Sequence, residues 1–248
     1  MNQFYKMYAN GNVYTINRKK TFYALGTFKD TTVERVFQFA CDMTFSDKGE
    51  HRDHRSGGFH KRKKGEIFAN TFQGKLAECA VYNQLFGKVE ISEPDFETYG
   101  LGRWDSADFL INGHKVSIKS TKAFGNLLLL ETRDWDSEGR YLPNNEAYDF
   151  TFLVRMKPYC EDVLRQARML YSDFVDLNEL RNIICSKNWE YDIPGFVALE
   201  ELQHIIRNQF IIPQGAMLNG KTRIDAENYY VQSGDMHNLS EFEGKFNE

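Results

Sequence analysis

The sequence predicts an α/β protein in which a mixed central sheet is flanked by helices, with additions at both ends. Three observations lead to this fold class. The dipeptide Asn112-Gly113 separates two short β-type runs, residues 72–86 carry an apolar pattern of helical period, and 127–130 and 150–155 read as apolar strands. A helix, a hairpin and further strands in that order can build such a sheet.

The hairpin at 108–119 is the most informative element. Asn-Gly tolerates the positive φ angles of a two-residue type I′ turn, which would pair Ile111 with His114. A four-residue loop is the alternative. In either register the side chains divide into one polar and one apolar face. The polar face carries Asp108, Ser117 and Lys119, and the apolar face carries Phe109, Ile111, Val116 and Ile118.

The polar face suits hydrolysis of a phosphodiester with a bound divalent cation. Asp108 and the backbone carbonyl of Ile118 are hard oxygen ligands of the kind that Mg²⁺ binds. Lys119 can orient or deprotonate the attacking water and offset phosphate charge. A second acid is expected at Glu78, on the edge of the apolar stripe of helix 72–86, pointing toward the sheet. Taken singly, an ordinary surface hairpin and a solvated helix glutamate are the alternatives.

Glu78, Asp108 and the tripeptide Ser117-Ile118-Lys119, in this order, resemble the PD-(D/E)xK nuclease superfamily, particularly its restriction endonuclease branch. The resemblance covers residues 66–158. Ser117 departs from it, because the family usually has Glu or Asp there. Family members with Ser recruit an acid from another element, for which Glu78 is the first choice and Glu131 the second. Asp105, just before the strand, ranks below Asp108.

The resemblance implies a Mg²⁺-dependent type II restriction endonuclease that cuts double-stranded DNA and leaves 5′-phosphate and 3′-hydroxyl ends. Asp108 and Glu78 would hold one or two metal ions, Lys119 would activate water, and Ser117 would contact a metal-bound water or orient Lys119. Simultaneous cleavage of both strands implies a homodimer. The alternatives are a structure-specific repair or recombination nuclease and a non-catalytic DNA-binding protein with a decayed nuclease site.

A basic segment precedes the helix that bears Glu78. The net charge is −4, yet residues 51–64 hold six Lys or Arg against one Asp, a composition that favours phosphate contacts over a merely solvated charge run. The three histidines in this run form no compact Cys/His pattern, so a metal site there is not expected. The expected DNA contacts are Arg52, Arg55, Lys61, Arg62, Lys63, Lys64, Arg103 and Lys122.

The 248 residues predict one elaborated domain, with a nuclease core over 66–158 that continues the sheet through 127–130. The N-terminal addition 1–65 is expected to hold one or two strands within 13–28 and a helix capped by Thr32. The C-terminal addition 159–248 is expected to be mainly helical, with helices near 163–172, 177–185 and 199–208. A cytoplasmic protein with four reduced, mostly buried cysteines is expected, because neither a signal peptide nor a CxxC pair occurs.

Overall fold

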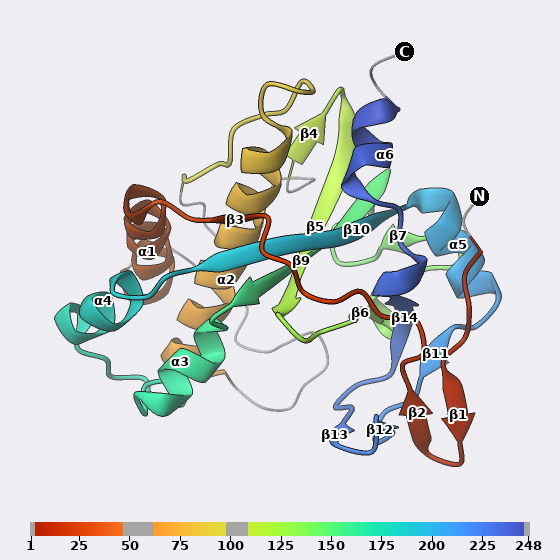
Figure 1. Cartoon of the computed structure of the whole chain (residues 1–248). Coiled ribbons are helices and arrows are strands. Elements are labelled where there is room, and N and C mark those ends of the chain that lie inside the picture. Colours follow the sequence, from red (N-terminus) through yellow and green to blue (C-terminus); the bar gives the residue numbers. More distant parts are fainter. Residues whose placement is uncertain (1–2, 47–61, 98–108, 246–248) are drawn as a thin grey trace.

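The computed structural model describes residues 3–46, 62–97 and 109–245. Its centre is a five-stranded sheet in the order β3-β10-β9-β5-β4 (Figure 1). β5 and β9 run parallel, and the other neighbouring pairs are antiparallel. The predicted mixed α/β architecture is therefore confirmed. These strands are β3 (Gly26–Thr27), β4 (Phe109–Ile111), β5 (His114–Lys122), β9 (Phe150–Lys157) and β10 (Glu190–Ala198).

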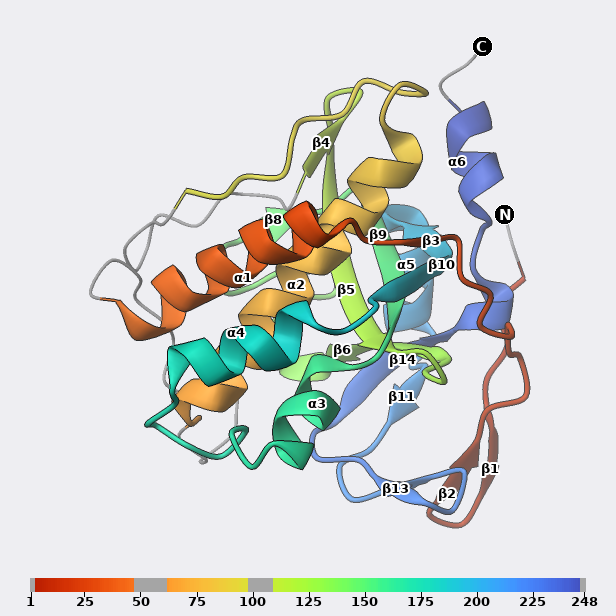
Figure 2. The same ribbon diagram turned by 60° about the vertical axis from the view of Figure 1, so that its left-hand side comes forward.

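Helices cover one face of this sheet. α2 (Lys64–Leu85) lies against it, and α1 (Asp30–Phe45) runs alongside α2 (Figure 2). α2 buries its apolar stripe against the side chains of β5 and β9, and this removal of apolar surface from water stabilises the layer. α3 (Cys160–Gln166), α4 (Leu177–Cys185) and α6 (Leu239–Gly244) complete the same core.

A second layer covers the opposite face. It contains a three-stranded sheet, β11-β14-β6, and the helix α5 (Leu199–Arg207). Its core joins β6 and α5 to Leu153 and Val197, which point away from the helical face. The central sheet thus separates two cores. The strands of this layer are β6 (Leu127–Glu131), β11 (Ile211–Ile212) and β14 (Asn228–Gln232).

The N-terminal segment is held by residues near the other end of the chain. β2 pairs in parallel with β12, and Tyr5 N donates a hydrogen bond to Asp235 Oδ2 (3.1 Å). Met7 N donates to Tyr230 Oη (3.0 Å) and Asn17 N to Gln232 Oε1 (3.0 Å). The small sheet that results consists of β1 (Tyr8–Asn10), β2 (Val13–Thr15), β12 (Met217–Leu218) and β13 (Thr222–Arg223).

Two predictions about single elements are wrong, one for the strand at 127–130 and one for the start of α1. The strand at 127–130 exists as β6 but lies in the second layer, because its leucines bury against Leu153 and Val197. The Thr32 cap is also wrong: α1 begins at Asp30 after Lys29, and no side chain caps it. Between β6 and β9 the chain forms the short helix η1 (Thr132–Asp134) and then a hairpin of β7 (Arg140–Tyr141) and β8 (Glu146–Ala147).

The expectation of a mainly helical C-terminal part is wrong as well. Helices α3, α4 and α5 form near the predicted positions, but β10 lies between α4 and α5 and pairs with β9 along its length. Proline and glycine are unfavourable in a regular strand, but Pro194-Gly195 lies in a β-bulge where the register with β9 shifts, and a bulge accommodates both residues. The short helix η2 (Ser233–Asp235) follows β14.

All four cysteines are free, and Cys41, Cys79 and Cys160 are buried, as predicted. Within the described ranges, no helix has both the length and the apolar character needed to cross a membrane.

Candidate active site

The hairpin has the predicted two-residue turn. Asn112 and Gly113 have φ angles of 46° and 79°, and Ile111 pairs with His114. This register rules out the four-residue loop. On the outer side of β4, Asn112 N donates to Glu90 O (2.8 Å) and Ser92 N to Leu110 O (3.1 Å). Residues 90–92 therefore hold the hairpin from the side opposite β5.

The two faces of the hairpin are divided as predicted for its described residues. Phe109, Ile111, Val116 and Ile118 are buried in the helical core. By strand alternation Ser117 and Lys119 point to the other face. Ser117 is only 2% exposed. The polar face is thus covered by the second layer near Ser117 and is not an open wet surface there. Asp108, the expected first metal ligand, lies outside the described residues, as does its rival Asp105.

β5 continues for six residues past Val116, the last residue that pairs with the described part of β4. In a two-residue hairpin the residues that flank the turn form a hydrogen-bonded pair, so alternate residues of β5 direct their backbone groups toward β4. Ile118 is in this set. Its carbonyl therefore faces the β4 side of the strand, whereas Ser117 and Lys119 are opposite Thr151 and Leu153 of β9.

Lys119 lies beneath an aromatic cluster of the second layer. Its Nζ is 5.7 Å from the ring centroid of Tyr141 on β7, within the range of a cation–π contact. The Tyr141 ring contacts Trp135 (5.3 Å between centroids) and Tyr148 (6.4 Å). No carboxylate of the described ranges forms an ion pair with Lys119. Among the described residues, the neighbour of this ammonium is therefore an aromatic ring and not a carboxylate.

The two candidate acids lie on opposite sides of the sheet. Glu78 is on α2, which packs on the face away from Lys119, and its Oε2 is 2.5 Å from Lys75 Nζ. Glu131 ends β6, in the layer on the Lys119 side, and its Oε2 is 2.6 Å from Arg133 Nη2. The sheet separates the helix that carries Glu78 from the side chain of Lys119.

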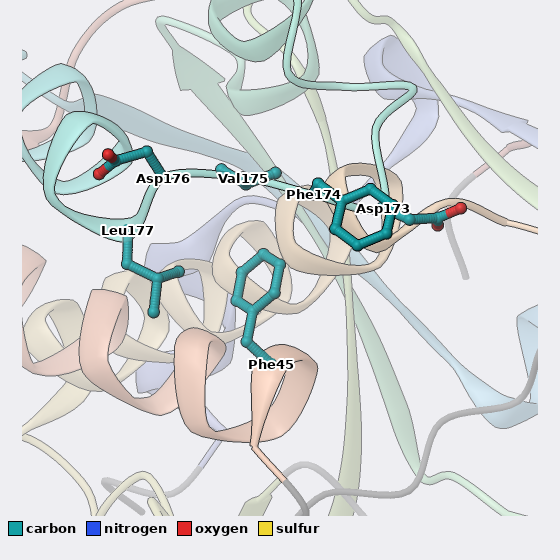
Figure 3. A pocket seen from close by; sticks show the side chains of 6 residues that line it. All are labelled: Phe45, Asp173, Phe174, Val175, Asp176 and Leu177. Carbon is teal, nitrogen blue, oxygen red and sulfur yellow. The ribbon is translucent and has the colours of Figure 1, made fainter.

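The basic residues of the predicted DNA surface that are described have protein partners. Lys63 Nζ binds Asp173 Oδ2 at 2.6 Å, and Lys64 Nζ is 5.9 Å from the Phe45 ring. Phe45 and Asp173 line an apolar pocket where α1 ends and α4 begins (Figure 3). Arg62 lies just before α2. The other predicted contacts, Arg52, Arg55, Lys61 and Arg103, lie outside the described residues.

Lys122, predicted to contact phosphate, ends β5 and binds Asp162 Oδ1 at 2.9 Å. Hydrogen bonds from Lys122 and Arg165 hold the pKa of Asp162 below its usual range, although partial burial opposes them. Sequence reasoning missed the neighbours of Lys119. Trp135, Tyr141 and Tyr148 were a signal for them, since three large rings in a polar segment indicate packing against something.

In the described parts of the chain, no group of three or more His, Cys, Asp or Glu side chains is arranged to hold a metal ion. Of the described oxygen donors on β5, the Ile118 carbonyl faces the β4 side, and the buried Ser117 hydroxyl lies on the face that the second layer covers. No family model, curated protein or solved structure matches the chain.

Proposed function

We propose that this chain is a Mg²⁺-dependent endonuclease that hydrolyses double-stranded DNA at a specific sequence. The observation that supports it best is the placement of two groups on β5 just after Val116, the last residue that pairs with the described part of β4. Over this stretch the Ile118 carbonyl is directed to the β4 side, and Lys119 is one residue further along without a described acid to neutralise it. A hard oxygen ligand for Mg²⁺ with an ammonium close to it suits metal-assisted hydrolysis of a phosphodiester.

The metal ligands would be the carboxylates of Asp108 and Glu78 and the Ile118 carbonyl, all hard oxygen donors that suit Mg²⁺. When bound, the ion would stabilise charge on the phosphate and acidify a water molecule. Lys119 would position the water for in-line attack, with Tyr141 holding its ammonium in place. The Ser117 hydroxyl would orient Lys119, its neighbour on the same face.

The two candidates for the second acid would approach the metal from different faces of the sheet. The Glu78 carboxylate would have to reach past β5, beyond the described part of β4, whereas Glu131 is already on the Lys119 side of the sheet. We keep Glu78 as the first choice because Ser117 contributes no charge and Glu78 is close to the sheet. Glu78→Gln and Glu131→Gln, compared for the Mg²⁺ concentration that gives half-maximal cleavage, separate the two.

The test is digestion of a long, sequence-diverse duplex with and without Mg²⁺, followed by sequencing of the ends. Lys119→Ala and Asp108→Ala are expected to lower cleavage by at least about a hundredfold, the lower range of a general acid–base contribution. Lys115→Ala is the matched control, since Lys115 is on the same strand and face but its ammonium binds Glu146.

Discrete Mg²⁺-dependent fragments that are lost in both test variants and kept in the Lys115 control would support the proposal. Cleavage that follows hairpins, mismatches or junctions and ignores sequence would favour a repair or recombination nuclease. Binding without cleavage of any duplex, unaffected by Mg²⁺, would favour a non-catalytic DNA-binding protein. A homodimer is part of the proposal, and light scattering of the complex with duplex DNA measures it.

A further inference from the structure

The C-terminal ends of the parallel strands β5 and β9 lie side by side in the central sheet, where Lys122 pairs with Met156. From these two strand ends the chain continues toward opposite faces of the sheet. After β5 it turns into β6 and the second layer, and after β9 it enters α3, which packs with α2 in the helical core. In open α/β sheets, the crevice between segments that diverge in this way is the usual position of a ligand.

A pocket occupies this position. Its volume of about 580 Å³ lies within the roughly 300–1,000 Å³ of small-molecule sites. Its walls come from three separate segments, residues 20–22, 122–126 and 156–159, and Asp162 closes one end.

Rings and cations gather in the lining. Phe124 is 78% exposed, although aromatic side chains bury a large apolar surface when they have a partner. Lys122 Nζ lies 5.9 Å from the centroid of Phe124 and 5.1 Å from that of Tyr159, so both rings are close to one ammonium. Lys157 adds a second cation with a 67% exposed side chain, and its Nζ lies 3.8 Å from Glu190 Oε2. Asp162, the acid of the lining, binds both Lys122 and Arg165.

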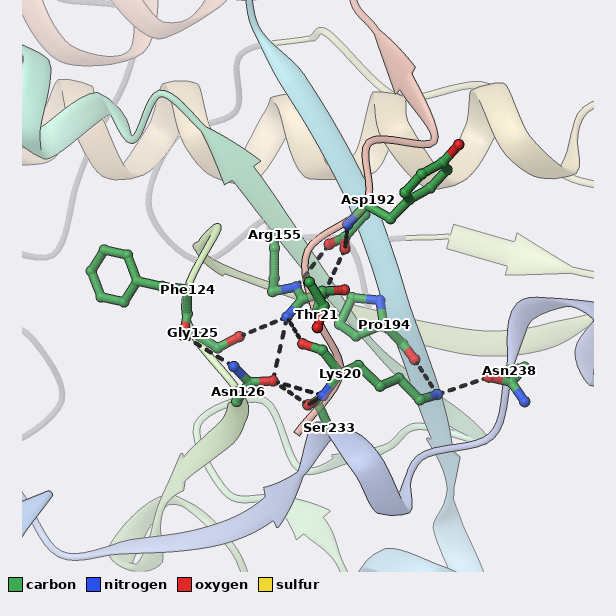
Figure 4. A network of polar contacts seen from close by, with 11 residues as sticks. Lys20, Thr21, Phe124, Gly125, Asn126, Arg155, Asp192, Pro194, Ser233 and Asn238 are labelled. Carbon is green, nitrogen blue, oxygen red and sulfur yellow. Dashed lines mark hydrogen bonds and ion pairs between the residues drawn. The ribbon is translucent and has the colours of Figure 1, made fainter. Parts of the chain in front are cut away.

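The buried guanidinium of Arg155 holds two walls of the pocket together through hydrogen bonds (Figure 4). Arg155 donates from Nη1 to Lys20 O (2.7 Å) and from Nη2 to Thr21 O (3.1 Å). On the opposite wall Nη1 lies 3.5 Å from Gly125 O. A single side chain thus ties two segments that are a hundred residues apart in sequence. A site held in this way loses little conformational freedom when it binds.

We propose that this pocket binds a nucleotide unit. Its base would lie against the rings of Phe124 and Tyr159, and its phosphate would contact Lys122 and Lys157. An exposed ring beside ammonium groups matches a planar base attached to an anion, and base–aromatic stacking tolerates any sequence. The inference goes beyond the proposed cleavage, because the pocket lies past the end of β5 and its test measures binding alone.

The test uses the full-length protein in EDTA and a fluorescein-labelled twelve-residue oligothymidylate, with binding followed by anisotropy. Phe124→Ala is expected to weaken binding by about tenfold, the scale of one lost stacking contact. Lys122→Ala is expected to weaken it as well, because it removes a phosphate contact. Phe124 is exposed, so its removal leaves the core intact. Phe174→Ala is the matched control, because it removes a 94% exposed ring from the separate pocket beside α4 and should leave binding unchanged.

Competition identifies the source of the nucleotide. Displacement of the probe by dAMP indicates a free nucleotide, and displacement only by unlabelled single strand indicates an unpaired strand; both support the proposal. The proposal is overturned if the wild-type protein binds neither probe nor dAMP, if a duplex of equal length competes as well as the single strand, or if Phe124→Ala binds like the wild type. Since no metal is present, these outcomes do not depend on whether the protein cleaves DNA.

Discussion

At the scale of single residues, the four cysteines illustrate how burial suppresses chemistry. Burial raises the pKa of the Cys41 thiol to about 12, with the Asp42 carboxylate adding to the effect. Burial and the Glu78 carboxylate raise the pKa of Cys79 to about 12. Burial also raises the pKa of Cys160 well above its ordinary value. Because the thiolate is the reactive form, these thiols are inert near neutral pH.

We predict that the folded protein resists alkylation by iodoacetamide at pH 8, and that all four cysteines react after denaturation. Cys185, which is partly exposed, should react first in the folded state. Its pKa of about 11, raised by burial and by the contact with Glu34, keeps even this reaction slow. Intact-mass measurement and peptide mapping at timed intervals check the order. Fast labelling of Cys41 or Cys79 in the folded protein would contradict it.

At the scale of elements, the ion pair between Arg155 and Asp192 joins β9 to β10. Arg155 is 1% exposed and Asp192 is 4% exposed. Arg155 Nε donates to Asp192 Oδ1 (2.8 Å), and Nη2 donates to Oδ2 (2.5 Å). The guanidinium binds backbone carbonyls as well, so its charge is compensated only while every partner is present.

We therefore predict that Asp192→Asn lowers the free energy of unfolding by about 3–5 kcal/mol, the cost of leaving one charge of a buried pair uncompensated. Urea denaturation measures the loss. Lys88→Ala is the control: it breaks an exposed pair with Glu243 and should cost less than about 1 kcal/mol. Equal losses of unfolding free energy in the two variants would show that the buried pair stabilises the fold no more than the exposed one.

The same elements show how far sequence reasoning reaches. The hairpin at Asn112-Gly113, the strand at 150–155 and helix α4 follow from local patterns, because turn chemistry and apolar period act over a few residues. β10 was missed because its Pro194-Gly195 is compatible with a strand only through the bulge against β9. The layer of β6 depends on which distant surface its leucines meet, and local periodicity does not encode that.

The candidate site was predictable to a similar degree. The shared face of Ser117 and Lys119 follows from strand alternation alone. The contact of Lys119 with Tyr141 depends on a chain excursion of some twenty residues that folds back over β5, so it required the tertiary structure. The placement of Glu78 across the sheet from Lys119 was equally hidden, since a helical pattern shows which face is buried but not which strand it meets.

At the scale of the whole molecule, the carboxylate of Glu241 makes the stability of the fold depend on pH. The His237 ring holds the pKa of Glu241 below its usual range through a hydrogen bond of 2.8 Å, and the Asn238 backbone N–H adds to it. A carboxyl whose pKa is lower in the folded than in the unfolded state stabilises the fold above its unfolded pKa. That contribution is lost as the pH falls through the folded value.

We predict that Glu241→Gln flattens the loss of stability below about pH 4.3, the ordinary value for glutamate. Urea midpoints measured at several pH values, with Glu200→Gln as an exposed single-charge control, test this. A wild-type slope in the Glu241 variant would show that the clamp between His237 and Glu241 is not part of the acid response. A lower stability of Glu241→Gln near neutral pH is not by itself a test, because it would not distinguish this variant from the Glu200→Gln control.

The hydrogen bonds of the N-terminal segment set the order in which the fold can be completed. Tyr5, Met7 and Asn17 bind partners at 230–235, so their native contacts close loops of more than two hundred residues. During synthesis, these residues must wait until partners more than two hundred residues later in the chain have emerged. Contacts of such long range slow folding. We infer that the central sheet and its helices form first, and that this segment, which leads directly into the pocket wall at residues 20–22, is the last part to settle.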